Sequence, residues 1–316
     1  MSYLKNRYFT AALLNVVNSN PNGDPDRNGE PRVNEYSGLG EITDVSYARK
    51  VRDIVNDKNC LIMQAAIEKL GIGDDLDRYN IMESKDVLMS NLKSMTVEQI
   101  LEKYWDIRMF GSTLLVPDEG KKSKGKKKKD DVEETESTEE EVDIKNENGK
   151  KITTSGVMRN HMSNSICPVE IRRMTLTQVR PRTDGDSGGM APNAFCVVNH
   201  GLYLMTSSIN PNYAHKTHCT SKDIELWLAL APYAYAVNPS FVRQQCEFVK
   251  FWVVEHEKAW GSFSENNVKS LLTPRKKDGK NDMPSYSLDD YDIPEGLPAN
   301  FAGIKSIREL VSEPYL

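Results

Sequence analysis

Apolar and polar positions follow two different periods along the chain, which indicates a mixed α and β fold. Residues 7–17 (RYFTAALLNVV) form a nearly continuous apolar run, and such a run predicts a strand that is buried on both faces. Three further stretches have the length and composition of strands. They are residues 170–179, 194–207 and 247–254.

Helical patterns lie between these predicted strands. Thr43 and Asp44 are favourable N-caps for a helix that continues to about Asn56. Arg49 and Arg52 point away from the apolar face of this helix, which is formed by Val45, Ala48, Val51 and Val55. Three more helices are predicted: residues 60–70, which Gly71 ends, residues from the capping box of Thr96 and Gln99 to about Trp105, and residues 221–237.

The succession of strand, helix, strand, strand, helix and strand predicts an α+β protein with a ferredoxin-like core, the fold of RNA-recognition modules. We expect a single RRM-like palm domain over residues 1–316 that carries several insertions. They are an Asn-, Gly- and Pro-rich loop at 18–43, a helical insertion at 58–111, a charged mobile loop at 117–150 and a C-terminal extension at 256–316.

The charged loop changes how the net charge of the chain is interpreted. The formal net charge is −5, whereas nucleic-acid binders usually have a basic surface. Between Asp118 and Lys150 there are 12 acidic and 9 basic residues, a local net of −3, so the remaining chain is near −2. Large apolar residues are too scarce in this segment to offset the entropy of ordering it. Composition therefore neither supports nor excludes an RNA ligand.

Cysteine usage and hydropathy favour a protein of the cytoplasm. The five cysteines are scattered and odd in number, which argues against a secreted disulfide framework. No apolar run is long enough to span a bilayer, and the first residues lack the layout of a signal peptide. We therefore expect a cytoplasmic protein that has no contact with a membrane.

Three ordered motifs carry the chemistry. The first is NPNGDPD at 20–26, followed by Pro31-Arg32, ITDV at 42–45 and RKVR at 49–52. The second is WDIRMFG at 105–111, and the third is RMTLT at 173–177 followed by HGLY at 200–203. This combination resembles the CRISPR RNA-binding backbone subunit of type I CRISPR Cascade complexes, in particular the type I-C and I-B branch of the RAMP superfamily. The chain departs from that family at SGVM (155–158), where Gly-Pro-Val-Gln is common, and at Ala48, where Lys is usual.

The resemblance implies a non-catalytic protein with finger and thumb elements inserted in its palm. Several copies would line up head to tail on CRISPR RNA, grip its sugar-phosphate backbone and interrupt its pairing with a thumb-like hairpin. Target DNA would be selected through the guide, and other Cascade subunits and a recruited nuclease would be the further partners. No cofactor and no metal ion are implied.

The residues that the resemblance and residue chemistry single out for RNA binding are arginines and a polar turn. Arginine grips phosphate bidentately, and a turn rich in Gly and Asn brings backbone N–H groups close to phosphate. Because Arg172 and Arg173 are adjacent on a predicted strand, they point to opposite faces, and we expect one of them to be structural. The candidates are Asn20, Asn22, Gly23, Arg32, Arg49, Arg52, Arg108, Arg172, Arg173, Arg180 and Arg182.

Two alternatives remain open from the residues. Asp24 and Asp26 could hold Mg²⁺ in a target-RNA nuclease, as in type III CRISPR complexes, or the chain could be a monomeric RNA-recognition module unrelated to CRISPR. The sequence has no P-loop, GxSxG, HExxH or deaminase motif. His215, His218 and Cys219 resemble part of a zinc site but have no fourth ligand at a recognisable spacing.

Overall fold

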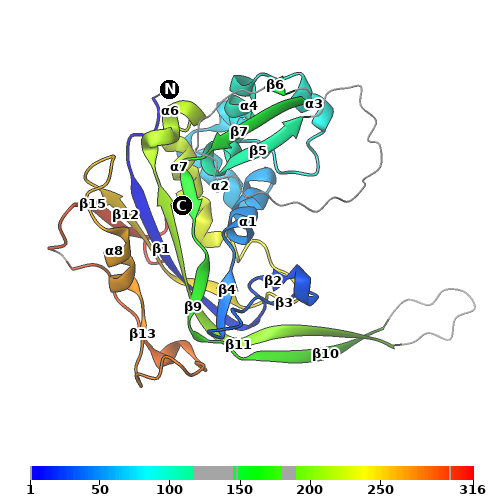
Figure 1. The fold of residues 1–316 in the computed structure, drawn as a ribbon, viewed down its shortest axis with the longest axis vertical. Coiled ribbons are helices and arrows are strands. Elements are labelled where there is room, and N and C mark those ends of the chain that lie inside the picture. The colour runs from blue at the N-terminus through cyan, green and yellow to red at the C-terminus, as the bar shows by residue number, and fades with distance from the viewer. Residues whose placement is uncertain (1, 117–144, 147–148, 180–189, 299) are drawn as a thin grey trace, which may run out of the picture.

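The computed structural model describes residues 2–116, 145–146, 149–179, 190–298 and 300–316. An antiparallel sheet of eight strands forms its centre (Figure 1). The strands are β1 (Tyr8–Ser19), β4 (Leu39–Ile42), β8 (Met158–Asn160), β9 (Ser163–Pro168), β10 (Ile171–Val179), β11 (Met190–Ile209), β12 (Cys246–His256) and β15 (Ile304–Glu309). Their order is β15-β12-β1-β11-β9-β4, and β8 and β10 also pair with β11. The predicted mixture of helices with a sheet is confirmed.

The first strand occupies the middle of the sheet, as its apolar run predicts. β1 pairs with β11 on one side and β12 on the other, with Leu13 opposite Leu204 and Ala11 opposite Trp252. Side chains alternate between the two faces of a strand. Phe9, Ala11 and Leu13 therefore pack in one apolar core, and Ala12, Leu14 and Val16 pack in a second core on the opposite face.

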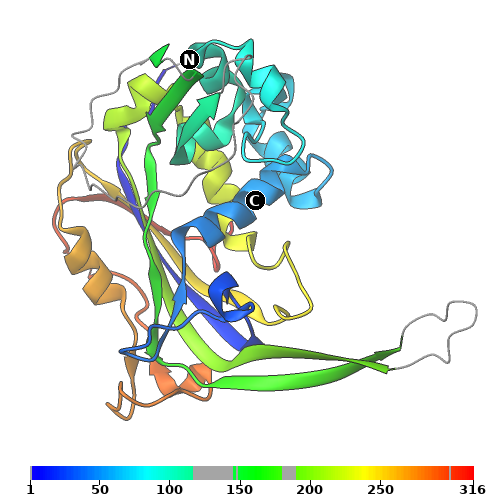
Figure 2. The same ribbon diagram turned by 45° about the vertical axis from the view of Figure 1, so that its right-hand side comes forward.

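Helices cover both faces of the sheet (Figure 2). The helices are α1 (Asp44–Asn56), α2 (Leu61–Leu70), α3 (Met89–Lys93), α4 (Val97–Lys103), α5 (Trp105–Phe110), α6 (Ala214–Thr217), α7 (Ser221–Leu230) and α8 (Glu265–Leu272). Helices α1, α2 and α7 lie on one face, and α8 packs on the other. Shorter 3-10 turns are η1 (Pro25–Arg27), η2 (Gly73–Tyr79), η3 (Pro211–Tyr213), η4 (Ala231–Tyr233) and η5 (Leu288–Asp290). Of the helices in the described residues, none combines the length and the apolar character that a membrane span requires.

The predicted helix ends are mostly confirmed. The Thr43 hydroxyl accepts a hydrogen bond from the Ser46 amide at the start of α1. Gly71 ends α2 in the left-handed conformation (φ 57°), and Thr96 forms the capping box of α4 with Gln99. Each cap satisfies backbone groups that have no partner within the helix.

Two predictions about helices are wrong. The helix expected over 221–237 ends at Leu230, because Pro232 cannot donate the backbone hydrogen bond that continues an α-helix. In α1, Val45 is 62% exposed although it was assigned to the apolar face, and Arg52 is buried. The interior around α1 therefore includes a charged residue.

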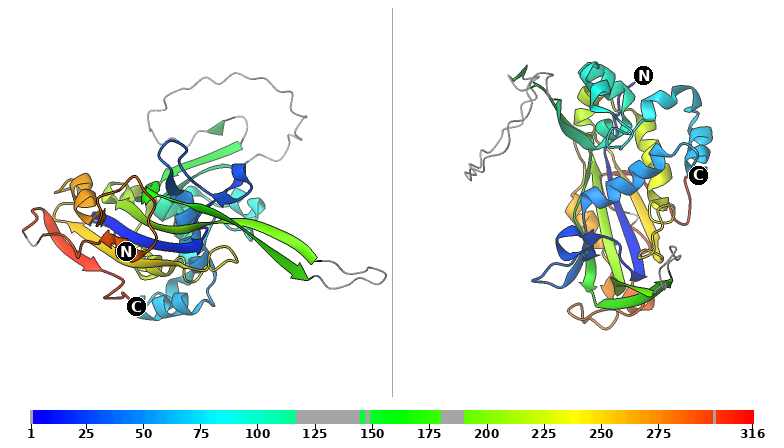
Figure 3. Two further views of the ribbon diagram at one scale, coloured as in Figure 1. Left: turned by 90° about the horizontal axis from the view of Figure 1, so that it is seen from below. Right: turned by 90° about the vertical axis from the view of Figure 1, so that its right-hand side faces the viewer.

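A two-stranded arm projects from the sheet (Figures 1 and 3). From Val198 to Ile209, β11 pairs with β1, whereas from Met190 to Val198 it pairs with β10. The sequence DGDSGG at 184–189 predicts a Gly-rich turn between these strands, and it lies outside the described residues. A separate small sheet has the order β5-β7-β6, formed by β5 (Gly111–Val116), β6 (Lys145–Asn146) and β7 (Gly149–Ser155). The C-terminal end of the predicted charged loop is therefore a strand, while residues 117–144 and 147–148 lie outside the described residues.

The C-terminal part is tied to the sheet by a partly buried carboxylate. Glu265 on α8 accepts hydrogen bonds from Arg7 (2.9 Å) and from the Ser208 hydroxyl (2.5 Å). The His256 ring stacks on Phe263, and its Nε2 lies 3.6 Å from Glu265. Burial raises the pKa of Glu265, but these neighbours together outweigh burial and lower it to about 2. The carboxylate therefore stays ionised and holds α8 against β11.

Candidate nucleic-acid interface

The Asn-rich turn after β1 is hydrogen-bonded to the start of α1. It contains β2 (Gly23–Asp24) and β3 (Glu30–Pro31), which pair with each other. Asn22 is buried, and its side-chain oxygen accepts hydrogen bonds from the Thr43 amide (3.1 Å) and hydroxyl (3.0 Å). A Cβ on Gly23 would lie 2.9 Å from the carbonyl oxygen of Gly29. Gly23 is therefore required by the close approach of the two short strands.

Asp24 and Arg32 form an ion pair across this turn. The Arg32 guanidinium lies 3.0 Å from the Asp24 carboxylate, which also accepts a hydrogen bond from the Asp26 amide. The Arg32 side chain is about a quarter exposed. Asp24 is thus already engaged by protein groups, and Arg32 has a fixed position at the surface of the turn.

The two arginines of α1 differ in burial. Arg49 is half-exposed and contacts Asp53 (2.8 Å) one turn further along the helix and the Glu83 carbonyl (2.9 Å). The Arg52 side chain is 5% exposed and lies between Glu83 (3.3 Å), Asp106 (3.6 Å) and the Phe110 ring (4.6 Å). Of the pair, Arg49 is the residue that a ligand on the surface can reach.

Arg108 lies in the interior of the protein. Its side chain and that of Asp223 are both 0% exposed, and Nη2 lies 2.6 Å from the Asp223 carboxylate. The remaining N–H groups donate to the carbonyls of Arg78, Leu101 and Glu102. Because its fork of donors is occupied by the protein itself, we reassign Arg108 from RNA contact to a structural role.

The arm carries two of the predicted arginines at its base. Arg172 and Arg173 are both exposed, and the expectation that one of them is structural stays a prediction. Arg172 donates to the Asn18 side chain on β1 (2.9 Å), whereas Arg173 lines a cavity on another side of β10. Arg180 and Arg182 lie outside the described residues.

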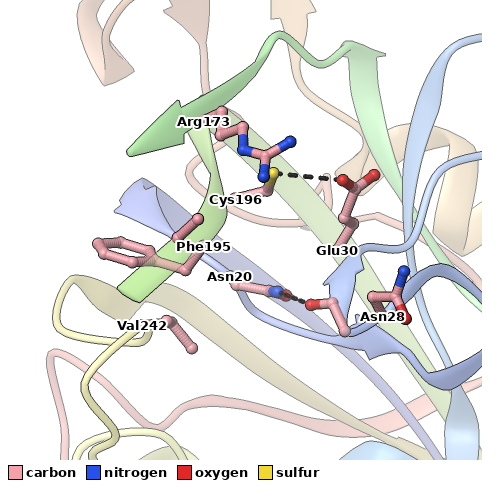
Figure 4. Close-up of a pocket in the computed structure, with 9 residues that line it drawn as sticks. Asn20, Asn28, Glu30, Arg173, Phe195, Cys196 and Val242 are labelled. Atoms are coloured by element: carbon pink, nitrogen blue, oxygen red, sulfur yellow. Dashed lines mark hydrogen bonds between the residues drawn. The ribbon is translucent and has the colours of Figure 1, made fainter. Parts of the chain in front are cut away.

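The cavity at the base of the arm has a volume of about 310 Å³ (Figure 4). It lies where the end of β1, the β2–β3 turn, the arm and the segment before β12 meet. It brings together two of the predicted residues, Asn20 and Arg173, but not Arg49 or Arg108. Its lining is Asn20, Asn28, Gly29, Glu30, Arg173, Ala194, Phe195, Cys196 and Val242.

The segment before β12 was missed by the sequence analysis. Arg243 donates to the carbonyls of Asn20 and Asn238, and Phe241 contacts the Phe195 ring in an edge-to-face pair with centroids 5.0 Å apart. Phe241 is 52% exposed. The sequence of this segment has no helical or strand period. A phenylalanine two residues before an arginine in such a segment is the sequence signal that could have indicated a surface contact.

Lys50 is a second residue that sequence analysis did not select. It is buried near Arg243, the residue that donates to the Asn20 carbonyl of the Asn-rich turn. Burial lowers the pKa of its ammonium group to about 8, and the positive charge of Arg243 lowers it further. Its Nζ donates to Ser46 and lies 4.8 Å from the centre of the Tyr235 ring. Positive charge is therefore concentrated under the turn although the chain as a whole is acidic.

The sequence matches a family model over residues 6–295, most of the chain. The match makes the chain a CRISPR-associated protein, the class that its three motifs predicted. It belongs to the family described as CRISPR-associated protein Cas7, and it is a CRISPR RNA-binding backbone subunit of a Cascade complex. The resemblance that was derived from the motifs is confirmed.

Solved structures also show similarity to the chain. A chain described as "CRISPR RNA-guided surveillance complex, pre-nicking" is 12% identical, with a TM-score of 0.43, and the match covers 78% of each chain. Another, described as "CRISPR RNA-guided surveillance complex", is 11% identical, with a TM-score of 0.40, and the match covers 78% of this chain and 68% of the other. No curated protein sequence matches the chain.

Proposed function

We propose that copies of this chain polymerise head to tail along CRISPR RNA and hold its backbone so that the guide bases remain available to target DNA. The observation that carries the proposal is the placement of the exposed arginines Arg49, Arg172 and Arg173. Arg172 and Arg173 lie at the base of the arm, where Arg173 lines the cavity beside the turn. Arg49 lies on α1, the helix to which the turn is hydrogen-bonded through Asn22 and Thr43. Such a surface offers bidentate donors to phosphate without reading base sequence.

We also propose that the central strands form a ferredoxin-like palm, and the order of the elements supports this. The central strands have the order β12-β1-β11-β9, and along the chain they occur as β1, α1, β9, β11, α7 and β12. That succession is the strand and helix order of the ferredoxin-like fold. The arm formed by β10 and β11 is the element that would act as the thumb, because it extends beyond the edge of this palm (Figure 3).

Head-to-tail contacts are heterologous, so each copy presents two different surfaces and the assembly grows as a filament. The remaining partners are other Cascade subunits and a recruited nuclease, which destroys the target DNA. The chain itself contributes binding and no bond cleavage. In support, Asp24, the carboxylate that a nuclease would use for Mg²⁺, is paired with Arg32 and the Asp26 amide. A cytoplasmic location remains a prediction from the sequence.

The test is charge reversal at the surface arginines. The chain is co-expressed with a CRISPR array, and the purified material is measured for its A260/A280 ratio and its mass. The parent protein is expected to give a ladder of masses, each step being one protein plus a fixed length of RNA. Arg49→Glu combined with Arg172→Glu is expected to lose the RNA and the ladder, because two phosphate contacts become repulsive.

Arg275→Glu is the matched control, because Arg275 is exposed on β13 (Arg275–Lys276) in the C-terminal part. It makes the same change of charge as each of the two single substitutions, but away from the turn, and is expected to retain the RNA. Arg52→Glu is excluded from the double variant because Arg52 is buried against Asp106. Unchanged RNA content in the double variant, or a parent protein that never co-purifies with RNA, contradicts the proposal.

A further inference from the structure

A carboxylate lies among the phosphate-binding candidates at the base of the arm. Glu30 is half-buried and lines the same cavity as Arg173. In the described residues its side chain accepts one hydrogen bond, from the Cys196 thiol (3.4 Å), and a thiol is a weak donor. A negative charge at this place opposes the binding of a polyanion unless the ligand also brings a hydrogen-bond donor.

The backbone that carries this carboxylate is tied into the turn. Glu30 belongs to β3 and lies opposite Asp24 of β2. The carbonyl of the preceding Gly29 accepts a hydrogen bond from the buried Asn20 side chain (2.8 Å), drawn as a dashed line in Figure 4. The Gly29 amide donates to the Asp24 carbonyl (2.7 Å). These bonds hold the acceptor beside the cavity, so a ligand that binds there does not have to order it.

A cation lies next to this acceptor. In Figure 4 the Glu30 carboxylate faces the Cys196 thiol, and the Arg173 guanidinium lies beside that thiol. An acceptor and a cation in one cavity fit a ligand that carries a hydroxyl and a phosphate on neighbouring atoms. The ribose of RNA carries its 2′-hydroxyl and its 3′-phosphate on adjacent carbons, whereas DNA lacks the hydroxyl. A volume of about 310 Å³ is at the lower end of the range for small-ligand sites, which suits one sugar unit.

We propose that Glu30 and Arg173 form a ribose subsite, in which the carboxylate accepts the 2′-hydroxyl of one nucleotide and the guanidinium contacts the adjacent phosphate. The inference rests on the proposed function, because the RNA backbone must already run over this surface. It adds the chemical feature by which the chain distinguishes RNA from DNA. Every ribonucleotide carries this hydroxyl, so the subsite accepts a guide of any base sequence.

The discrimination follows from the state of the carboxylate with each nucleic acid. With RNA, the 2′-hydroxyl donates to a charged acceptor, and such a bond is stronger than one between neutral groups. With DNA, the carboxylate stays beside a phosphate with no donor between them, and the like charges repel each other. A hydrogen bond to a charged group corresponds to about tenfold in affinity. Glu30 therefore favours RNA partly by penalising DNA.

The first experiment measures binding of the full chain, by fluorescence anisotropy, to a labelled single strand of mixed base sequence that is long enough for several copies. Three forms share this sequence: RNA, its 2′-fluoro form, and DNA with deoxyuridine in place of thymidine. The 2′-fluoro form keeps the RNA-like sugar pucker but cannot donate a hydrogen bond, so it separates the hydroxyl from the shape of the strand. The titration midpoint for RNA is expected to be about tenfold lower than for either other strand.

Glu30→Gln is the decisive variant, because it keeps the shape of the side chain and one acceptor oxygen but removes the negative charge. It is expected to tighten binding to DNA and to the 2′-fluoro strand more than to RNA, so that the gap narrows to less than about threefold. Glu35→Gln is the matched control. It removes the same charge from the same loop, but Glu35 pairs with Arg27 and does not line the cavity. This control is expected to keep the tenfold gap.

The second experiment tests whether RNA reaches the cavity. Cys196 lines it, whereas Cys60, which precedes α2, does not, and both thiols are half-buried. Alkylation of the two thiols by iodoacetamide is followed by peptide mass spectrometry with and without saturating RNA. RNA is expected to slow the alkylation of Cys196 at least fivefold more than that of Cys60, because the sugar covers the thiol beside Glu30.

The outcomes separate the two proposals. Equal affinity of the parent for RNA and for the 2′-fluoro strand overturns the ribose subsite while leaving RNA binding intact. A gap that is unchanged in Glu30→Gln, or that narrows equally in Glu35→Gln, also overturns it. The same holds for a Cys196 that saturating RNA leaves unprotected. Absence of binding to every strand contradicts the proposed function itself.

Discussion

Replacement of Arg108 tests the reassignment of this residue from the RNA surface to the interior. Arg108→Met keeps most of the volume of the side chain and removes the guanidinium. The change leaves the fully buried Asp223 carboxylate without its cation and leaves the carbonyls of Arg78 and Leu101 without donors. We expect this variant to lose stability and to show no specific defect in RNA contact.

The magnitude follows from these contacts. Removing one partner of a buried ion pair costs about 3–5 kcal/mol, and each buried carbonyl left unpaired adds about 1 kcal/mol. Asp223 keeps its bonds from the Thr220 amide (2.7 Å) and hydroxyl (2.9 Å), which limit the loss. A total of about 5 kcal/mol is therefore expected, a large share of the ~5–15 kcal/mol that is typical of native proteins.

The assay is urea unfolding followed by tryptophan fluorescence, which reports on this region because Trp105 Nε1 donates to the Asp223 carbonyl (3.1 Å). Arg108→Met with Asp223→Asn is expected to recover about 2 kcal/mol, because no uncompensated charge remains. Arg27→Met is the matched control: Arg27 pairs with Glu35 at the surface, and such pairs contribute less than about 1 kcal/mol. The reasoning is refuted if Arg108→Met costs no more than Arg27→Met.

Three further predictions concern the fold around the site. Glu265→Gln is expected to be about 2 kcal/mol less stable at pH 7. The folded-state pKa of Glu265 is about 2, below its ordinary value of about 4.5. The contribution of the ionised carboxylate to the free energy of unfolding is therefore present above pH 4.5 and is lost as the pH falls towards 2. Thermal unfolding of both proteins between pH 7 and pH 3 should show the gap narrow, and a constant gap would contradict the assignment. Gly40→Ala is expected to cost about 3 kcal/mol in urea unfolding, because the added Cβ would lie 2.2 Å from the Tyr203 hydroxyl oxygen. Tyr203→Phe is expected to be nearly neutral alone, because that hydroxyl has no partner in the described residues. Combined with Gly40→Ala, it should recover part of the loss. Asn22→Ala is expected to cost about 1–2 kcal/mol by leaving the Thr43 amide without its acceptor, and a cost below 0.5 kcal/mol in the same assay would show that the turn is not bonded to α1.

The sequence predicted those elements whose apolar period or capping residues lie within the element itself. β1 is a continuous apolar run, and it is buried because both of its faces and both of its edges are covered. The caps at Thr43, Gly71 and Thr96 depend on groups a few residues away. The short strands β4, β8 and β9 were not predicted, since strands of three to six residues have too little periodicity to be distinguished from loops.

The arginines show where local pattern is insufficient. Arg49 and Arg52 lie three residues apart on one helix, and both appeared to belong to a solvated face. Arg52 is buried because Asp106, 54 residues further along the chain, lies beside it. Arg108 is buried because Asp223, 115 residues away, supplies its counter-charge. The windows of roughly 11–18 residues in which helix and strand periods are judged are too short to contain both members of either pair.

The sequence by itself determined the family, through three ordered motifs, and the mixed fold, through periods that each element carries within itself. Tertiary structure alone decided which charged side chains face the solvent and which face one another. It also assembled the cavity at the base of the arm, where Asn20 and Glu30 of the loop after β1 meet Arg173 of the arm and Val242 of the segment before β12. The physical reason is that burial of a charge depends on a partner supplied by folding, whereas the period of an apolar strand or the cap of a helix does not.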